Sequence, residues 1–429
     1  MKTKIIIITL FVLVVSGSLI FLTRQEKGKI YSPSAKIISD LKTKFSQYPE
    51  CPADLTGILT APLIELKYIS ALTPLGNLNP PGHTSPVDHI YFSTDSETKI
   101  PIYAPADSWI TNIITVAFDR GHGFEPYGYV VQFTVCNGLV LDFANINDIS
   151  QTLKNEIANQ KGDCYDGPQK MGHDGPERQC SYSINLKISS GEQVGYVQRT
   201  KKSDGNFDFP FEIWAADYNK PAPSNIDWSY YDNDDRYAHI MCPFDLYAGI
   251  LKQQFYDKLG GVNQLMNKDE KTGKQLGATS VFKRRIIEPI CGTVNQNLVG
   301  TIQGMWFGEG WQNRKDKSMS DNIKQFSFLH WNIDPTYTAI GNAGEITSGR
   351  SGQLQFIANH SGTIDREPSE VKADGQVYCY KYNVAENGQI AQEGKILVQL
   401  IDDRHLKLEY KTGFCGTTET FVKSYSYER

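Results

Sequence analysis

Short runs in which apolar and polar residues alternate make up most of the chain after residue 71. The runs 99–118, 128–146 and 182–198 are rich in β-branched and aromatic residues and are bounded by Gly, Pro, Asn or Asp, which is the pattern of strands joined by turns. The run 395–410 alternates on both sides of Asp402-Asp403, which predicts a hairpin with one buried face. The sequence therefore predicts a mainly β protein.

One internal segment has a different period. In 243–268, Leu246, Ile250, Phe255 and Leu259 can share one face of a helix, and Gly260-Gly261 supplies a stop. We therefore expect a short helical connector between two β-domains, the second of them a sandwich or a barrel-like fold. The expected organisation is a linker at 31–70, a first β-domain at 71–242, the connector at 243–289 and a second β-domain at 290–429.

The N-terminal segment predicts a membrane helix. Residues 5–22 carry no charge, and this run of 18 residues follows Lys2 and Lys4. That length is close to the roughly 20 residues that a membrane-spanning helix needs. No A-x-A-like cleavage site follows, which favours an uncleaved anchor within residues 1–30 over a cleaved signal peptide.

The cysteines indicate an oxidising compartment. There are eight, and none forms a C-x-x-C pair, so zinc-finger spacing is absent. Behind a membrane anchor, an even number predicts structural disulfides and a body outside the cytoplasm. Cys164 and Cys180 bracket a Gly/Asp-rich loop and are one expected pair, and Cys379 and Cys415 on adjacent strand-like segments are a second. The pairing of the other four remains open.

Composition excludes several classes of protein. Apolar residues make up 40% of the chain and charged residues 21%, which is typical of a folded globular protein. The formal net charge of -5 argues against nucleic-acid binding, because phosphate contacts need a basic surface.

Candidate chemistry is concentrated at 83–89. His83, Asp88 and His89 stand within seven residues, and imidazole and carboxylate groups are both zinc ligands. A complete site needs a further ligand, for which Asp208 is a candidate. From spacing alone, the alternative that both histidines are loop residues bonded to the backbone is favoured.

Five segments in a fixed order carry a family resemblance. After His83 and Asp88 come I-P-I-Y-A-P-A-D-S-W-I at 100–110, an N-G turn followed by F-A-N-I at 143–146, S-G-E-Q-V-G at 190–195, and F-P-F-E at 209–212. Together the region 79–216 resembles the lysostaphin-like zinc endopeptidases, which cut peptidoglycan and have a duplicated hybrid β-fold. The resemblance covers about a third of the chain.

The departures from the family pattern affect the reaction. Asn145 stands where the family has a catalytic histidine, and Asp208 and Pro210 stand at the two histidines of H-x-H. Four residues separate His83 from Asp88, where the family has three. Proline offers no lone pair to a metal, and an amide is not a general base near neutral pH. The resemblance therefore implies the family fold without the family reaction.

Three functions follow as hypotheses. The first is a single-pass protein of the cell membrane whose extracytoplasmic, non-catalytic endopeptidase-like domain binds a cell-wall polymer or an envelope protein, or regulates a hydrolase, with no cofactor. The alternative is a divergent zinc-dependent cell-wall endopeptidase that uses His83, Asp88 and a substitute ligand such as His89 or Asp208. The third is a structural envelope protein.

Overall fold

The computed structural model of the chain is mainly β, with 45% strand. Within the described ranges no helix is long and apolar enough to cross a membrane. The predicted anchor at 5–22 and the candidate ligand Asp208 lie outside those ranges. The structure describes residues 45–80, 83–94, 98–119, 121–167, 176–198, 210–224, 226–231, 236–268, 275–311, 324–344, 346–347, 351–382, 384–386, 389–392 and 394–429.

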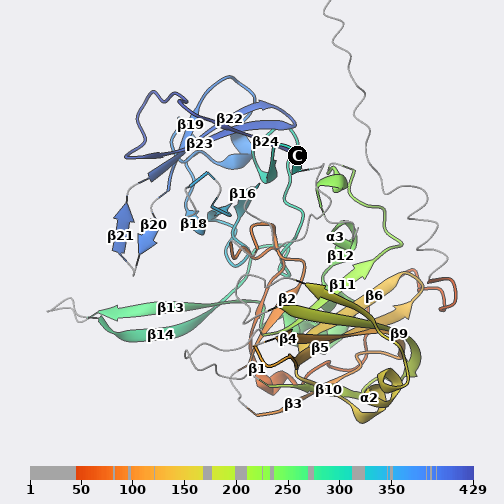
Figure 1. Cartoon of the computed structure of the whole chain (residues 1–429). Coiled ribbons are helices and arrows are strands. Elements are labelled where there is room, and N and C mark those ends of the chain that lie inside the picture. The colour runs from red at the N-terminus through yellow and green to blue at the C-terminus, as the bar shows by residue number, and fades with distance from the viewer. Residues whose placement is uncertain are drawn as a thin grey trace, which may run out of the picture.

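The first β-domain is built on a large antiparallel sheet (Figure 1). Its strand order is β1-β2-β11-β6-β5-β4-β9-β8, and β12 pairs with β11 as a ninth strand. The order places β11, late in the chain, between β2 and β6. The strands are β1 (Ile69–Thr73), β2 (Ile90–Thr94), β4 (Ser108–Asp119), β5 (Phe124–Cys136), β6 (Leu139–Ile146), β8 (Asp163–Gly167), β9 (Glu177–Ile188), β11 (Phe211–Asp217) and β12 (Ile240–Met241).

A second, three-stranded sheet shares the core with one face of the large sheet. It consists of β3 (Ile100–Tyr103), β10 (Gln193–Val197) and β7 (Asp148–Ile149), and helix α2 (Gln151–Ala158) follows β7. Between the sheets, Ile102, Phe133 and Phe143 are fully buried in one apolar cluster. The alternation of each strand sends every second side chain into this core and leaves the others on the opposite face.

The described part of the predicted linker is packed rather than free. Leu63 and Ile64 are fully buried in the core, and Ile64 forms a β-bridge with Ile102. A short 3-10 helix, η1 (Leu66–Tyr68), then leads into β1. The region 45–68 is therefore part of the first domain, because its apolar residues complete the layer beneath β3.

The predicted helical connector is only partly helical. Between η2 (Trp228–Tyr230) and the ribbon lie α3 (Arg236–His239), η3 (Pro243–Leu246) and α4 (Gly249–Tyr256). The chain then forms β13 (Gly260–Lys268) and β14 (Gln275–Arg284), a two-stranded ribbon that projects from the body (Figure 1). A Cβ at Gly260 would lie 2.1 Å from the carbonyl oxygen of Lys283. Glycine thus permits close strand pairing here, whereas the helix has already ended at Tyr256, so the predicted stop at Gly260-Gly261 is wrong.

The second β-domain is one eight-stranded antiparallel sheet, β18-β17-β16-β15-β24-β23-β22-β19. Its two edge strands come close to each other, since the rings of Phe356 and Tyr380 lie 5.9 Å apart in one apolar cluster. The strands are β15 (Gly304–Gly308), β16 (Gln325–His330), β17 (Thr338–Asn342), β18 (Gly352–Phe356), β19 (Tyr378–Lys381), β22 (Gly394–Asp402), β23 (His405–Thr412) and β24 (Tyr425–Glu428), with 3-10 helix η6 (Pro368–Glu370) and the small ribbon β20 (Val384–Glu386) and β21 (Gln389–Gln392) beside them.

The predicted hairpin at 395–410 is confirmed as β22 and β23. The side chains that the alternation places on one face, among them Ile396, Val398 and Leu408, are fully buried. Near the hairpin, the guanidinium of Arg429 stacks on Trp306 at 4.3 Å and donates to the carbonyl oxygens of Leu298, Thr301 and Gln303. These contacts tie the last residue of the chain to the start of the domain.

All eight cysteines form disulfides. The predicted pairs Cys164–Cys180 and Cys379–Cys415 are confirmed, and Cys164 is the direct register partner of Cys180 across β8 and β9. The pairs that the sequence left open are Cys51–Cys136 and Cys242–Cys291.

Candidate functional site

The outer face of the large sheet carries a cavity of about 460 Å³. Tyr91, Glu212 and Ala144 are register neighbours on β2, β11 and β6, so their side chains lie in one row. All three line the cavity. Ile213, the residue after Glu212, faces the apolar core, as strand alternation requires.

Aromatic and amide side chains extend this cavity across three further strands. Phe118 comes from β4, Tyr127 and Tyr129 from β5, and Glu177 and Gln179 from β9. The rings of Phe118 and Tyr127 meet edge to face at 4.9 Å. Phe118 is the register partner of Glu177, which places an apolar wall beside a carboxylate.

An ion-paired network closes one side of the cavity. Nδ1 of His89 lies 2.7 Å from Oδ1 of Asp88, and Nε2 of His89 lies 3.2 Å from Oε2 of Glu212. The other oxygen of Asp88 lies 2.7 Å from a guanidinium nitrogen of Arg236. Both ring nitrogens of His89 therefore face carboxylates, and both oxygens of Asp88 face positive or donor groups.

The network shifts the pKa values of its members. Burial alone would raise the pKa of Asp88, but Arg236 and His89 hold it well below its usual range. Burial would lower the pKa of His89, but Glu212 and Asp88 raise it overall. Burial raises the pKa of Glu212, and His89 opposes that rise. Asp88 is accordingly an anion in the folded protein.

Arg236 reaches this network from helix α3. Its guanidinium lies 4.8 Å from the ring of Trp214, which stands two residues beyond Glu212 on the same face of β11. The stacking fixes the guanidinium plane next to Asp88. Removing either partner of such a pair is destabilising, because the other charge is then left without compensation in a largely buried environment.

His83 lies beside the network. Its ring is 5.9 Å from that of His89, and its Nδ1 is buried without a hydrogen-bond partner. Burial, with a smaller contribution from His89, lowers the pKa of His83 to about 4. The backbone of His83 exchanges two hydrogen bonds with Asn79, which fixes the turn that carries it.

Three of the four predicted metal ligands lie in the described part of the chain, and the structure brings these three together at the ion-paired network. His83, Asp88 and His89 are neighbours, yet Asp88 and His89 are bonded to each other and to Arg236 and Glu212. Among the residues that the structure describes, no group of three His, Cys, Asp or Glu side chains is arranged to hold a metal ion. Of the three described candidates, only His83 offers a nitrogen that lies outside this network.

Asn145 and Pro210 meet at the rim of the cavity. Nδ2 of Asn145 donates to the carbonyl oxygen of Pro210 at 2.9 Å, and both residues line the cavity. Asn145 has φ of 57°, a left-handed conformation that asparagine tolerates better than most residues. Two of the three positions that the sequence analysis singled out thus form a contact with each other.

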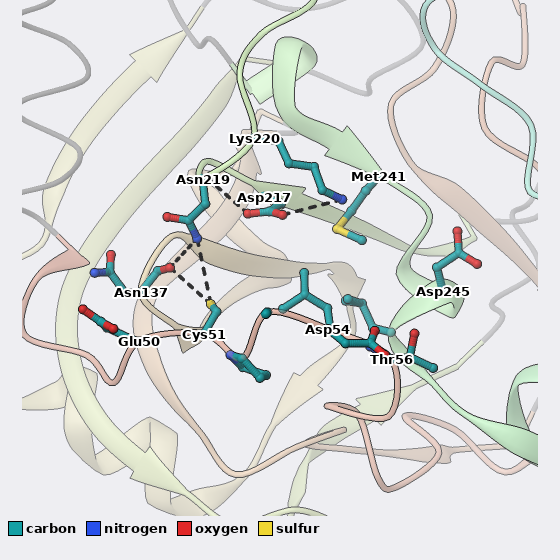
Figure 2. A pocket seen from close by; sticks show the side chains of 14 residues that line it. Glu50, Cys51, Asp54, Thr56, Asn137, Asp217, Asn219, Lys220, Met241 and Asp245 are labelled. Atoms are coloured by element: carbon teal, nitrogen blue, oxygen red, sulfur yellow. Dashed lines mark hydrogen bonds and ion pairs between the residues drawn. The ribbon is translucent and has the colours of Figure 1, made fainter.

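A second and larger hollow, of about 720 Å³, lies at the other end of the same strands (Figure 2). Its carboxylates are tied to nearby donors. Asp54 accepts from the backbone of Thr56 at 2.9 Å, Asp217 from the backbone of Asn219 at 3.1 Å, and Asp245 from the hydroxyl of Tyr256 at 2.5 Å. Cys51, which is bonded to Cys136, and the exposed Lys220 also line this hollow.

Sequence reasoning did not assign roles to Arg236, Glu212 or the cavity tyrosines. Arg236 is far from Asp88 in the chain, so no local pattern links the two. Glu212 was visible only as the last letter of F-P-F-E, and Tyr91 as part of a strand. The available signal was the alternation of β2 and β11, which places His89, Tyr91 and Glu212 on one face.

Comparison of the chain with models of known protein families, with curated proteins and with solved structures found no match.

Proposed function

We propose that the chain is a membrane-anchored, extracytoplasmic binding protein of the cell envelope. Its first β-domain, similar to a degenerate lysostaphin-like endopeptidase, binds a cell-wall polymer in the cavity beside Glu212 without cleaving it. In the cell this binding localises the protein on the wall or regulates a hydrolase there.

One observation carries the proposal. His89 lies between Asp88 and Glu212, and Arg236 engages the remaining oxygen of Asp88. In a metallopeptidase, side chains of these types bind the metal ion or act as general bases on the metal-bound water, so they must be free of other partners. Here they neutralise one another, at the wall of a cavity of about 460 Å³ that is also lined by aromatic side chains. A site of this kind is suited to binding rather than to hydrolysis.

The order of the strands gives further support. The segment with His83 and Asp88 leads into β2, and the other four segments that carry the resemblance lie in or next to β3, β6, β10 and β11. Asn145 and Pro210, two of the three substituted positions, lie together at one rim. The disulfides agree with an oxidising, extracytoplasmic location.

The test is cosedimentation of the purified full chain with insoluble peptidoglycan, together with assay of the supernatant for released fragments. We expect the chain to sediment with the polymer and to release nothing. Glu212→Gln should weaken sedimentation, while Asp217→Asn, on the same strand at the second hollow, serves as the matched control. Failure of the wild-type chain to sediment with peptidoglycan would contradict the proposal.

The divergent-endopeptidase alternative is tested on the same preparation. Elemental analysis should find zinc near one equivalent if the alternative holds, and His83→Ala should remove it. Fragment release that depends on this zinc would replace the binding proposal with an enzymatic one.

A further inference from the structure

We infer that the cavity beside Glu212 recognises an ammonium group on an apolar stem, as at the end of a lysine-like side chain in a peptide. This inference rests on the proposed function, since it concerns the ligand of the same cavity. It names the chemical group that the lining selects.

The first argument is charge. Two carboxylates, those of Glu177 and Glu212, line the cavity from β9 and β11. The described residues of the lining include no lysine and no arginine, and its histidine His89 is held between Asp88 and Glu212. With His89 protonated, the two cations of the network balance Asp88 and Glu212, and the carboxylate of Glu177 leaves one negative charge in excess. Arg236 lies behind this surface and is bound to Asp88. A phosphate or carboxylate ligand would be repelled by this lining, whereas a cation would be attracted.

The second argument is the aromatic wall. Tyr91, Tyr127, Tyr129 and Phe118 bring four rings to the cavity from three strands. The face of an aromatic ring attracts a cation, and the same ring packs well against methylene groups. Carboxylates next to rings therefore fit a ligand that is positively charged at its tip and apolar along its stem.

The third argument is the set of lone pairs that the lining has to offer. His83 belongs to the cavity wall, but its unbonded Nδ1 is closed to solvent, so the accessible acceptor of this network is the carboxylate of Glu212. Glu212 faces His89 through Oε2, and a carboxylate has further lone pairs to offer. An ammonium group brings three donors, so it can satisfy several acceptors that the protein places around one space.

Neutral sugars are the competing ligand. The lining also carries amides, including those of Asn77 and Gln179, which suit hydroxyl groups. A neutral sugar, however, gains little from the carboxylates, and it would leave them buried beside a group without charge. The charge of the lining therefore favours the amine.

The test is titration of the full chain with Nα-acetyl-lysine methylamide and with its Nε-acetylated form, which has the same stem but no charge. We expect acetylation of the ε-nitrogen to weaken binding by about tenfold or more, because it removes a charge-assisted hydrogen bond and a cation–π contact. Glu212→Gln should cause a loss of similar size for the amine only. Asp217→Asn should change neither titration.

The outcomes separate this inference from the proposed function. Equal binding of the two lysine probes, or binding of neither, overturns the ammonium assignment. Peptidoglycan whose free amines have been acetylated then tests the polymer. Sedimentation that survives acetylation leaves the wall-binding function standing and overturns the inference, whereas lysine-probe selectivity without any sedimentation supports the inference and contradicts wall binding.

Discussion

Strands β6 and β11 have a hollow at each end, and the two hollows differ in kind. Glu212 lines one and Asp217 the other, five residues apart on β11, or roughly 17 Å of extended strand. The hollow at Asp217 is larger, with a volume of about 720 Å³ against about 460 Å³ at Glu212. Volume alone would therefore select the hollow at Asp217, whereas the proposed function places the binding site at Glu212.

The two hollows differ in how far apart in the chain their carboxylates and the partners of these carboxylates lie. At Asp217 the carboxylates are bonded to neighbours close in sequence, as in ordinary turns. At Glu212 the charged groups come from distant parts of the chain, and His83 keeps a buried nitrogen without a partner. Long-range assembly of charged groups beside an aromatic wall is what marks a candidate site here.

The sharpest way to break this comparison is to remove one cation at each end. Arg236→Met should lower the free energy of unfolding by about 3 kcal/mol, because it removes the guanidinium from one oxygen of the buried Asp88 and leaves His89 as its remaining partner. Lys220→Met should change it by less than about 0.5 kcal/mol, since Lys220 is exposed and lies 3.7 Å from Asp217. Denaturant unfolding of both variants measures the difference. Equal effects would show that the network at Asp88 is not the more strongly coupled of the two.

Two disulfides provide a second comparison. Cys164→Ser/Cys180→Ser should cost about 3 kcal/mol of stability and should also weaken binding of the lysine probe, because the bond holds β8 against β9, which carries Glu177 and Gln179. Cys51→Ser/Cys136→Ser should cost at least as much stability, since it opens a longer loop, but should leave binding unchanged. Thermal unfolding and titration of each double variant test this. Loss of probe binding in both would remove the distinction between the two ends.

The smallest expected effect concerns Asn145. Asn145→Ala removes the hydrogen bond to Pro210 and puts at positive φ a residue that tolerates this conformation less well than asparagine does. We expect the free energy of unfolding to fall by about 1–2 kcal/mol. Asn145→Gly also loses the bond, but its backbone adopts positive φ freely and should cost less than alanine does. The order of the two denaturation midpoints is the measurement. A glycine variant less stable than the alanine variant would mean that backbone conformation does not govern this position.

Strand periodicity predicted much of the fold. The hairpin of β22 and β23 could be predicted because alternation at Ile396, Val398 and Leu408 reflects burial of one face. The ribbon of β13 and β14 was not anticipated, because the helical pattern that begins at Leu246 was extended past Tyr256, where α4 ends. The packing of Leu63 and Ile64 was missed as well, since a segment between turns carries no period that reveals tertiary contacts.

The candidate site was only half visible in the sequence. His83, Asp88 and His89 stand close together in the chain, so their chemistry could be predicted, although not the state in which they are held. Arg236 and Glu212 decide that state, and both are brought to Asp88 and His89 by tertiary folding. Disulfide pairing shows the same limit. Cys164 and Cys180 flank one loop, whereas Cys51 and Cys136 meet only after β5 has been placed in the sheet.

The pairing of β15 with β24 has a consequence for how the second domain is made. The first and last strands of that sheet lie side by side at its centre, with Phe307 opposite Glu428, on the order of 120 residues away in the chain. During synthesis from the N-terminus, the central strand pair of this sheet cannot form until β24, the last strand, has been made. The domain is therefore expected to fold late and slowly, whereas the sheet that carries the cavity can already form once β11 and β12 are available.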